Sequence, residues 1–433
     1  MSAHGALNSV QLAMEHSRLT RTPMLIAPKD ATGCFDLMRP ELVKLIQDSK
    51  GVPTNTTKAT TMILSKMARY VRTDHGTSTQ YIQKTSDNNI GGIGQGAGNG
   101  PQGSNCQTGL LKTIHGKTCP GMNITHPLQT NSFRIFGPGF IDNQIDTATL
   151  PSQKLTENTQ LITHILQSWQ DLLNATGGDL SLEKCSYGIL SYDFTPTRFG
   201  NNNVSMHTAT TNPGEISLQP LNQRQLPKTL KRLDPLTPEK YLGVHINMEG
   251  TWKSEFGRRK TQFKEIAQKI RTAKMTRLDA YLIYQVRYKK ALTYFLHHTH
   301  LSTTQCDEIQ RPFILAILPK MGFNRFMKRA VIFGPEKFGG MALADAKIEQ
   351  AVSIIADMMV EIQRATIVGA QYTNLIATYQ QYLGIDTPFF LSDPSNFPYK
   401  PKNSRITFIW QSLYHSQATV QGESWWLPKS TLT

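Results

Sequence analysis

Hydrophobic positions near the N-terminus predict a short helix, a strand and then two more helices. "LNSVQLAMEHSRL" (7–19) reads as a helix, and "PMLIAP" (23–28) is a continuous apolar run typical of a buried strand. "PELVKLI" (40–46) begins a second helix, and a third is predicted over about 55–72. The last prediction rests on apolar residues at helical spacing: Met62, Ile63, Met67 and Val71.

Helical periodicity returns in the middle of the chain and dominates beyond residue 256. Over 157–176 one face carries the apolar positions, and "TGG" (176–178) ends this helix. "KYLGVHINMEGTW" (240–252) has strand character, and a helical, basic region follows it. The two expected core-facing stripes are Leu161, Ile165, Trp169, Leu172 and Leu173 in the first helix, then Phe263, Ile266, Ile270 and Leu278.

Composition predicts a folded protein that is neither secreted nor embedded in a membrane. Of the 433 residues 39% are hydrophobic, and no run approaches the ~18 apolar residues of a membrane helix. The N-terminus lacks the basic start and apolar stretch of a secretory signal. Five scattered cysteines form no CxxC pair, which favours a reducing compartment. We therefore expect an intracellular protein, nuclear or cytoplasmic.

Charge adds a candidate partner. The chain has a net charge of +15, and between Arg258 and Lys290 eleven Lys or Arg residues face only two acids, Glu265 and Asp279. Such a run often forms a solvated helix face. Because the excess has one sign, it also suits contact with a nucleic-acid backbone.

Two acidic positions follow apolar strands. Asp30 comes directly after "PMLIAPK", and "GFIDNQID" (139–146) places Asp142 and Asn143 after an apolar pair. Each of these alone also fits an ordinary turn, because Asp and Asn bond the local backbone. The glycine-rich tract 88–105 between them fits a linker equally well. Two carboxylates from different strands are, however, what a pair of metal ions requires.

Taken in order, these segments resemble the palm of reverse transcriptases, particularly those of non-LTR retroelements. The resemblance covers roughly residues 5–365, and it also includes a stretch after the thumb helices, "FGPEKFGGMALAD" (333–345). The matching palm segments are "DATGCFD" (30–36), "GIGQGAGNGP" (92–101), "FIDN" (140–143), "ATGGDLSLEKC" (175–185) and "YLGV" (241–244), the last resembling the strand that closes the palm.

The resemblance implies an α+β fold, in which an antiparallel palm sheet with helices on one face precedes an α-helical thumb. It places the palm and a remnant of the fingers in 1–250, the basic thumb in 251–365 and a partly irregular tail in 366–433. It also implies RNA-directed DNA synthesis, a template-directed nucleotidyl transfer by a two-metal-ion mechanism. The implied cofactor is two Mg²⁺ ions, and the implied partners are an RNA template, a DNA primer and deoxynucleoside triphosphates.

By the same resemblance, Asp30 and Asp142 bind the metal ions, and Lys184 lies near the triphosphate as a proton donor. Lys184 also fits an exposed helix-end lysine. Phe35 would exclude a ribose 2′-hydroxyl and so select deoxynucleotides, unless it is simply a core aromatic. The remaining implied contacts are Gln95 and Gly96 with the nucleotide, and Arg258, Arg259, Lys260, Lys264 and Lys269 with nucleic acid.

Two departures from the family pattern predict weak or lost activity. Asn143 stands where the family has a second aspartate, and only 29 residues precede Asp30, as in a truncated copy with most of the fingers missing. The alternative is therefore a non-catalytic, nucleic-acid-binding remnant, and a third possibility is a basic scaffold that binds proteins. The histidines of "LHHTHLSTTQC" (296–306) fit a helix end better than zinc, because no second spaced pair is evident.

Overall fold

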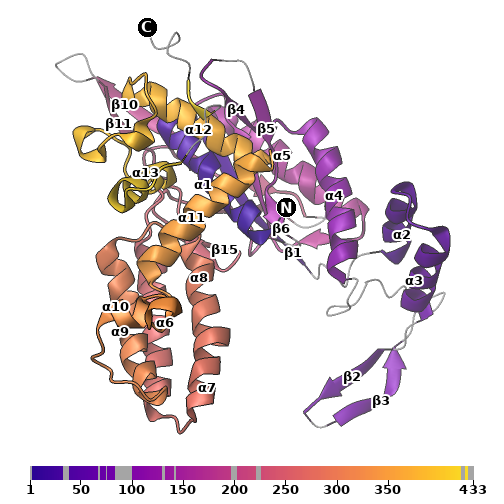
Figure 1. Ribbon diagram of the computed structural model, residues 1–433. Coiled ribbons are helices and arrows are strands. Elements are labelled where there is room, and N and C mark those ends of the chain that lie inside the picture. The colour runs from indigo at the N-terminus through magenta and orange to yellow at the C-terminus, as the bar shows by residue number, and fades with distance from the viewer. Residues whose placement is uncertain are drawn as a thin grey trace. The chain divides into compact units, whose positions relative to one another are not determined.

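The computed structural model divides the chain into two compact units, which we call the sheet unit and the helical unit (Figure 1). The sheet unit contains Pro23–Asn123 and Arg134–Asp234, and the helical unit contains Ser2–Thr22, Ile124–Phe133 and Pro235–Thr433. The structure describes residues 2–32, 39–66, 69–74, 76–82, 100–128, 132–140, 143–196, 202–220, 226–420 and 425–427.

The sheet unit is built around β1 (Met24–Thr32), the apolar strand predicted from the sequence. The strand order is β14-β9-β1-β7-β6, and β8 pairs with the end of β1. All pairings are antiparallel except that of β14 with β9. The other strands of this sheet are β6 (Gly139–Phe140), β7 (Asn143–Thr149), β8 (Asp179–Leu180), β9 (Ser186–Leu190) and β14 (Lys231–Leu233).

Two helices cover one face of this sheet, α4 (Gly100–Thr118) and α5 (Leu155–Ala175). Alternate residues of β1, Leu25 and Ala27, join Trp169 of α5 in one buried core, as the two-residue period of a strand requires. The helix expected over 157–176 is therefore confirmed. So is the α+β class with an antiparallel-dominated sheet and helices on one face.

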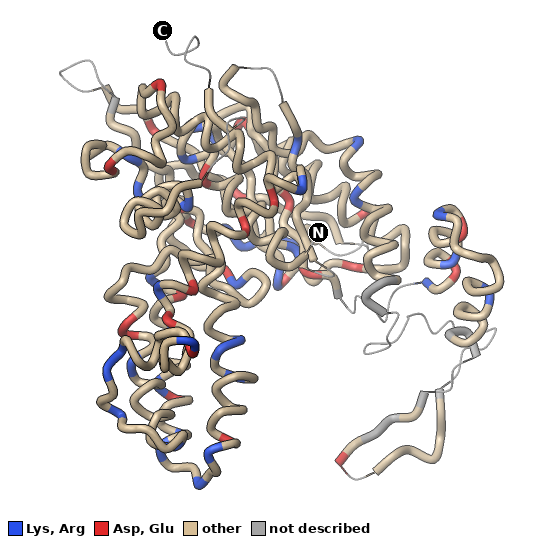
Figure 2. Tube along the Cα trace, viewed as in Figure 1, with Lys and Arg blue, Asp and Glu red and all other residues tan. Residues whose placement is uncertain are grey.

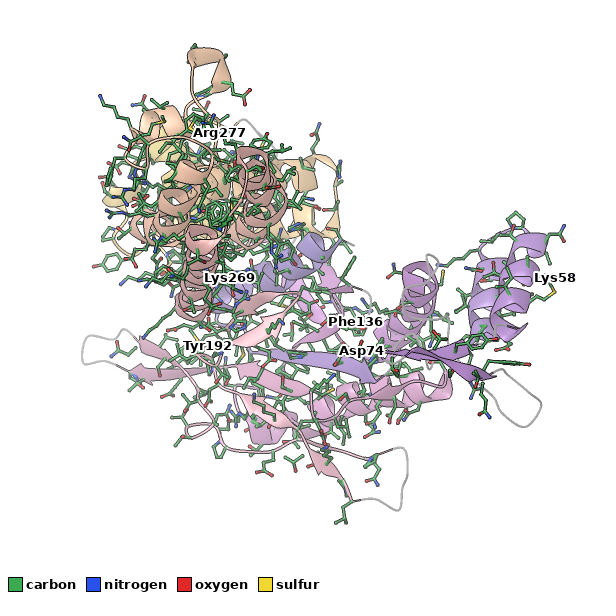
Figure 3. All side chains as sticks on the ribbon, turned by 90° about the horizontal axis from the view of Figure 1, so that it is seen from below. Lys58, Asp74, Phe136, Tyr192, Lys269 and Arg277 are labelled. Atoms are coloured by element: carbon green, nitrogen blue, oxygen red, sulfur yellow. The ribbon has the colours of Figure 1, made fainter. Side chains whose placement is uncertain are left out.

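The helix predicted over about 55–72 is shorter in the structure, and a strand follows it. The helix α3 (Thr54–Lys66) ends early, because residues 69–73 pair with β3 instead. Met62 and Ile63 are exposed, so their helical spacing did not indicate a buried face. Figure 3 labels Lys58 on α3 and Asp74 beside the turn between β2 and β3. The remaining elements here are α2 (Pro40–Ser49), β2 (Arg69–Thr73), β3 (Gly76–Ile82), β10 (Tyr192–Pro196), β11 (Asn202–Met206), β12 (Ser217–Leu218) and β13 (Lys228–Thr229).

Helices form most of the helical unit. Its segment "YLGV" makes the turn of a two-stranded hairpin, where Leu242 and Gly243 have positive φ values of 46° and 82°. The segment therefore does not extend the sheet around β1, contrary to the expectation from the resemblance. The elements from this hairpin onward are β15 (Glu239–Tyr241), β16 (Val244–Ile246), α6 (Lys253–Thr272), α7 (Arg277–Leu282), the π-helix η1 (Ile283–Lys289), α8 (Lys290–Leu296), α9 (Thr303–Lys320), α10 (Arg329–Phe333), η2 (Glu336–Phe338), α11 (Ala346–Gln363), α12 (Ile367–Leu383), η3 (Phe389–Leu391), η4 (Pro394–Asn396) and α13 (Arg405–Ser416).

The unit boundaries differ from the expected 1–250, 251–365 and 366–433. The N-terminal helix α1 (Ala3–Thr20) belongs to the helical unit, where the buried Glu15 accepts a hydrogen bond of 2.8 Å from the backbone N of Arg405. Leu12 of α1 packs in one core with Trp410 of α13. Residues beyond 366 thus form helices that share a hydrophobic core with the chain's first helix.

One further pair of strands lies outside the sheet around β1. The strands β4 (Met122–Thr125) and β5 (Ser132–Ile135) pair with each other. Within the described ranges, no helix is both long and apolar enough to cross a membrane.

Candidate functional site

Asp30 lies near the end of the central strand β1, directly opposite Asn143 on β7. Directly opposed residues of antiparallel strands present their side chains on the same face, with Cβ atoms roughly 5 Å apart. The Asp30 carboxyl group is 29% exposed, so it is open to a ligand. The strand pairing thus places two polar oxygen-bearing side chains together at one end of the sheet.

Asn143 begins β7, and its hairpin partner β6 ends at Phe140, with which it pairs. Asp142 lies between the two strands in the sequence and falls outside the described residues. Phe35, Gln95 and Gly96 also fall outside them. The predicted roles of these four residues therefore stay predictions.

Lys184 is held against the end of β1 by a tight turn. The backbone N of Ser181 donates to the backbone O of Asp30 (3.0 Å), and that of Lys184 donates to the O of Ser181 (2.8 Å). The Lys184 ammonium nitrogen lies 3.1 Å from Oδ2 of Asp30. Lys184 stands in a turn between β8 and β9, so the interpretation as a helix-end lysine is wrong.

The ion pair between Lys184 and Asp30 is easily replaced, because the Lys184 side chain is 70% exposed. Exposed pairs of this kind contribute roughly 0–1 kcal/mol. A divalent cation at the Asp30 carboxylate can therefore compete with the ammonium group. The displaced Lys184 ammonium group would then lie close to any ligand bound to that cation.

The donor set at this end of the sheet fits a single magnesium ion. The Asp30 carboxylate and the Asn143 amide both offer hard oxygen atoms, and Mg²⁺ keeps several water ligands beside one or two carboxylates. Among the described residues, no group of three His, Cys, Asp or Glu side chains is placed to hold a metal ion. A second ion would depend on Asp142.

A buried charged network lies on the opposite, helix-covered face of the same strands. The Lys29 ammonium group forms an ion pair with Oδ2 of Asp146 and lies 4.1 Å from the ring centre of Trp169. Nε2 of His115 lies 3.4 Å from the same carboxylate oxygen. Burial opposes the charge on Asp146, yet Lys29 and His115 outweigh it and lower the pKa of Asp146 to about 2. The carboxylate is therefore charged throughout the physiological range.

The network continues into helix α4. Nδ1 of His115 lies 3.2 Å from Sγ of Cys119, and its ring centre lies 4.8 Å from that of Phe136, which Figure 3 labels. Sequence reasoning missed this cluster, although one signal was present. Lys29 directly follows the apolar run predicted to be a buried strand, and buried charges are almost always paired.

The basic residues expected to contact nucleic acid lie on α6, in a region rich in Lys and Arg (Figure 2). Arg258 and Arg259 both form ion pairs with the buried Glu255, at 2.7 and 2.6 Å. Arg259 is itself buried, so the prediction that it contacts a phosphate backbone is wrong. Its guanidinium group compensates an internal carboxylate instead.

The other expected contacts remain on the surface. The Lys260 ammonium group lies 2.5 Å from Glu308 on α9, so it already has an acidic partner. Lys264 and Lys269 are exposed, and Figure 3 labels Lys269. Of the five predicted residues, these two are best placed to meet a polyanion.

The histidines near the end of α8 serve the interior of the helical unit. Nδ1 of His298 lies 2.8 Å from Oδ1 of Asn8, and Nε2 of His297 lies 3.2 Å from Oδ1 of Asp357. Burial and the neighbouring cations lower the pKa of His298. Histidines that contact polar side chains in a helix-end core agree with the interpretation preferred over zinc.

No protein-family model and no curated protein matches the chain. Among solved structures, the chain aligns with "telomerase from Candida albicans" in complex with the TWJ fragment of telomeric RNA. The alignment covers 83% of this chain and 53% of the telomerase chain, with 11% sequence identity and a TM-score of 0.27. The chain thus spans about half the length of that protein. At this TM-score the match assigns neither a family nor a function.

Proposed function

We infer that the chain is a reverse transcriptase-like palm and thumb derived from a non-LTR retroelement. The observation that carries this proposal is the register of β1 and β7, which places Asp30 opposite Asn143. One residue before Asn143 stands Asp142, the second carboxylate of the motif order. Two segments distant in sequence, one containing Asp30 and the other Asn143, thereby meet at one end of an antiparallel sheet.

The proposed reaction is RNA-directed DNA synthesis, in which a primer 3′-hydroxyl displaces pyrophosphate from a deoxynucleoside triphosphate. Asp30 and Asp142 would hold Mg²⁺, which stabilises the attacking and leaving oxygens of such an in-line displacement. Phe35, Gln95 and Gly96 would line the nucleotide pocket. Lys184, whose ammonium nitrogen lies 3.1 Å from Asp30, would donate a proton to the leaving group.

We propose that this activity is weak or lost in the natural chain. The Asn143 amide supplies one acceptor oxygen but no charge. Lys184 adds a positive charge beside Asp30, which a cation must displace at a cost of roughly 0–1 kcal/mol. Both effects reduce the attraction for a second Mg²⁺ ion.

The partners follow from the same proposal. An RNA template and a DNA primer would contact the exposed cations of the basic thumb, led by Lys264 and Lys269 on α6. Their phosphate contacts would make binding weaken steeply with salt.

A second candidate function is nucleic-acid binding without catalysis. It is favoured by the neutral Asn143 opposite Asp30 and by the ion pair that Lys184 forms with Asp30. Both candidates share the fold and the basic surface. They differ in whether the Asp30 end of the sheet binds a divalent cation.

Electron paramagnetic resonance of Mn²⁺, which takes the same oxygen ligands as Mg²⁺, separates the two candidates. The polymerase proposal predicts that the full chain removes about one equivalent of free Mn²⁺ signal and that Asp30→Asn abolishes this binding. Asp193→Asn, which neutralises an exposed carboxylate on β10, is the matched control and should bind as the natural chain does. Equal binding by all three proteins would refute Asp30 as a metal ligand.

A further inference from the structure

The segment 320–340 of the helical unit exposes aromatic side chains among cations. It contains five basic residues and a single acid, Glu336. The side chains of Phe326 and Phe338 are 74% and 78% exposed. Large exposed aromatics gathered in one segment indicate an interaction surface.

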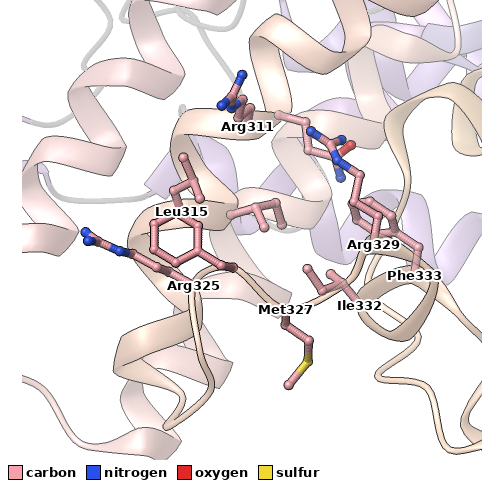
Figure 4. A pocket seen from close by; sticks show the side chains of 10 residues that line it. Arg311, Leu315, Arg325, Met327, Arg329, Ile332 and Phe333 are labelled. Carbon is pink, nitrogen blue, oxygen red and sulfur yellow. The ribbon is translucent and has the colours of Figure 1, made fainter.

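Phe326 differs from Phe338 because it borders a pocket, which Figure 4 shows in close view. The pocket has a volume of about 180 Å³, below the roughly 300–1,000 Å³ of sites that enclose a whole drug-sized ligand. It suits one planar ring of a larger molecule. Apolar side chains of α9, α10 and the loop between them line it, among them Leu315, Met327 and Ile332.

Three arginines surround this apolar lining, Arg311 from α9, Arg325 from the loop and Arg329 from α10 (Figure 4). Arg329 forms an ion pair of 3.0 Å with Asp307. Arg311 and Arg325 have no acidic partner in the part of the chain that the structure describes. Two arginines at the pocket are therefore available to an external anion.

The guanidinium group of Arg325 lies 4.8 Å from the ring centre of Phe326. This contact orients the ring and the cation together at the pocket. A planar aromatic surface beside unpaired arginines is the combination that single-stranded nucleic acids recognise, through base stacking and phosphate contacts. An apolar peptide would not require the one-signed charge, and duplex bases are stacked on both faces already.

We propose that this pocket binds one unpaired base of single-stranded nucleic acid, which stacks on Phe326 while Arg311 and Arg325 contact the flanking phosphates. The inference shares with the proposed function the premise that the chain binds nucleic acid. It rests on different residues, however, and requires neither metal nor catalysis. A failure of Mn²⁺ binding or of DNA synthesis would leave it standing.

The first test measures binding of a fluorescein-labelled 12-nucleotide uridine strand to the full chain by fluorescence anisotropy, without divalent cations. Phe326→Ala should weaken binding by roughly 5- to 150-fold, the range that corresponds to stacking of one base. Phe338→Ala is the matched control. Phe338 is equally exposed and has the Lys337 ammonium 4.8 Å from its ring centre, but it lies outside the pocket. Unchanged binding by Phe326→Ala, or equal losses in both variants, would overturn the proposal.

The second test separates base stacking from charge. The natural chain should bind an abasic strand of the same length more weakly than the uridine strand, and Phe326→Ala should bind both equally. Arg311→Gln with Arg325→Gln should lower the salt dependence of binding by about 0.7 per lost phosphate contact. If the natural chain binds the two strands equally, the pocket takes no base, and a protein partner becomes the better occupant. Circular dichroism confirms that each surface variant remains folded.

Discussion

Replacing Lys29 with Met should destabilise the sheet unit by about 3–5 kcal/mol, because it leaves the fully buried Asp146 carboxylate without its ammonium partner. The two residues lie on the adjacent strands β1 and β7, two positions apart in register. In a unit of about 200 residues, this loss corresponds to roughly 6–20 °C in melting temperature. The same strands carry Asp30 and Asn143, so the strand pairing at these two residues should also be destabilised when the ion pair is lost.

The effect should depend on pH in a defined direction. In the natural chain the pKa of Asp146, about 2, lies below the roughly 3.9 of an unfolded aspartate. Its stabilisation is therefore complete above about pH 4 and is lost as the pH falls through 2. Without Lys29, burial should raise the pKa of Asp146, with His115 left as the neighbour that opposes this rise. The variant's deficit in unfolding free energy should then be largest near pH 7 and shrink towards pH 4.

The assay is urea unfolding followed by hydrogen exchange of the peptides that cover β1 and β7, which reports on the sheet unit alone. The control is the double variant Lys29→Met with Asp146→Leu. It replaces the whole ion pair by apolar side chains and should recover most of the stability. A cost below about 1 kcal/mol for the single variant, or a double variant no more stable than the single one, would refute the reasoning.

Two further predictions concern nucleic-acid contacts and nucleotide choice. Lys264→Glu with Lys269→Glu should reduce primer–template affinity and lower the slope of log K against log salt by about 0.9 per lost phosphate contact. Equal slopes for the natural chain and this double variant would show that the two lysines are only a solvated face. Arg259→Met, by contrast, should chiefly lower the melting temperature of the helical unit. In any version of the chain that extends a primer, Phe35→Ala should admit ribonucleotides, as measured by ribo- against deoxynucleotide incorporation; unchanged discrimination would make Phe35 a core aromatic.

The elements around Asp30 were predictable from the sequence because each depends on a local pattern. The apolar run of β1 and the periodic face of α5 appear where the sequence predicts them. The hairpin strands on either side of residues 141 and 142 also follow from "GFIDNQID". The register of β1 with β7 was not predicted, since strand periodicity alone does not choose between neighbouring alignments.

Other features depend on contacts between distant residues, which periodicity does not contain. Helix α1 joins the helical unit because Glu15 meets Arg405, some 390 positions away. Arg259 looked like part of a solvated basic run; its partner Glu255 is only four positions away, but the spacing does not show that both side chains are buried by the rest of the unit. Met62 and Ile63 have the spacing of a core helix, yet both side chains are exposed.

The most direct test of the proposed site is primer extension on an RNA template in Mg²⁺. It compares three proteins: the natural chain, the single variant Asn143→Asp, and a double variant that carries both Asn143→Asp and Asp30→Asn. Restoring a carboxylate opposite Asp30 should raise the rate by roughly 10²- to 10³-fold, since a charge–charge interaction near a metal is worth a few kcal/mol. Adding Asp30→Asn should abolish that gain. If Asn143→Asp binds primer–template as tightly as the natural chain but extends it no faster, the convergence of Asp30 and Asn143 is not a polymerase site.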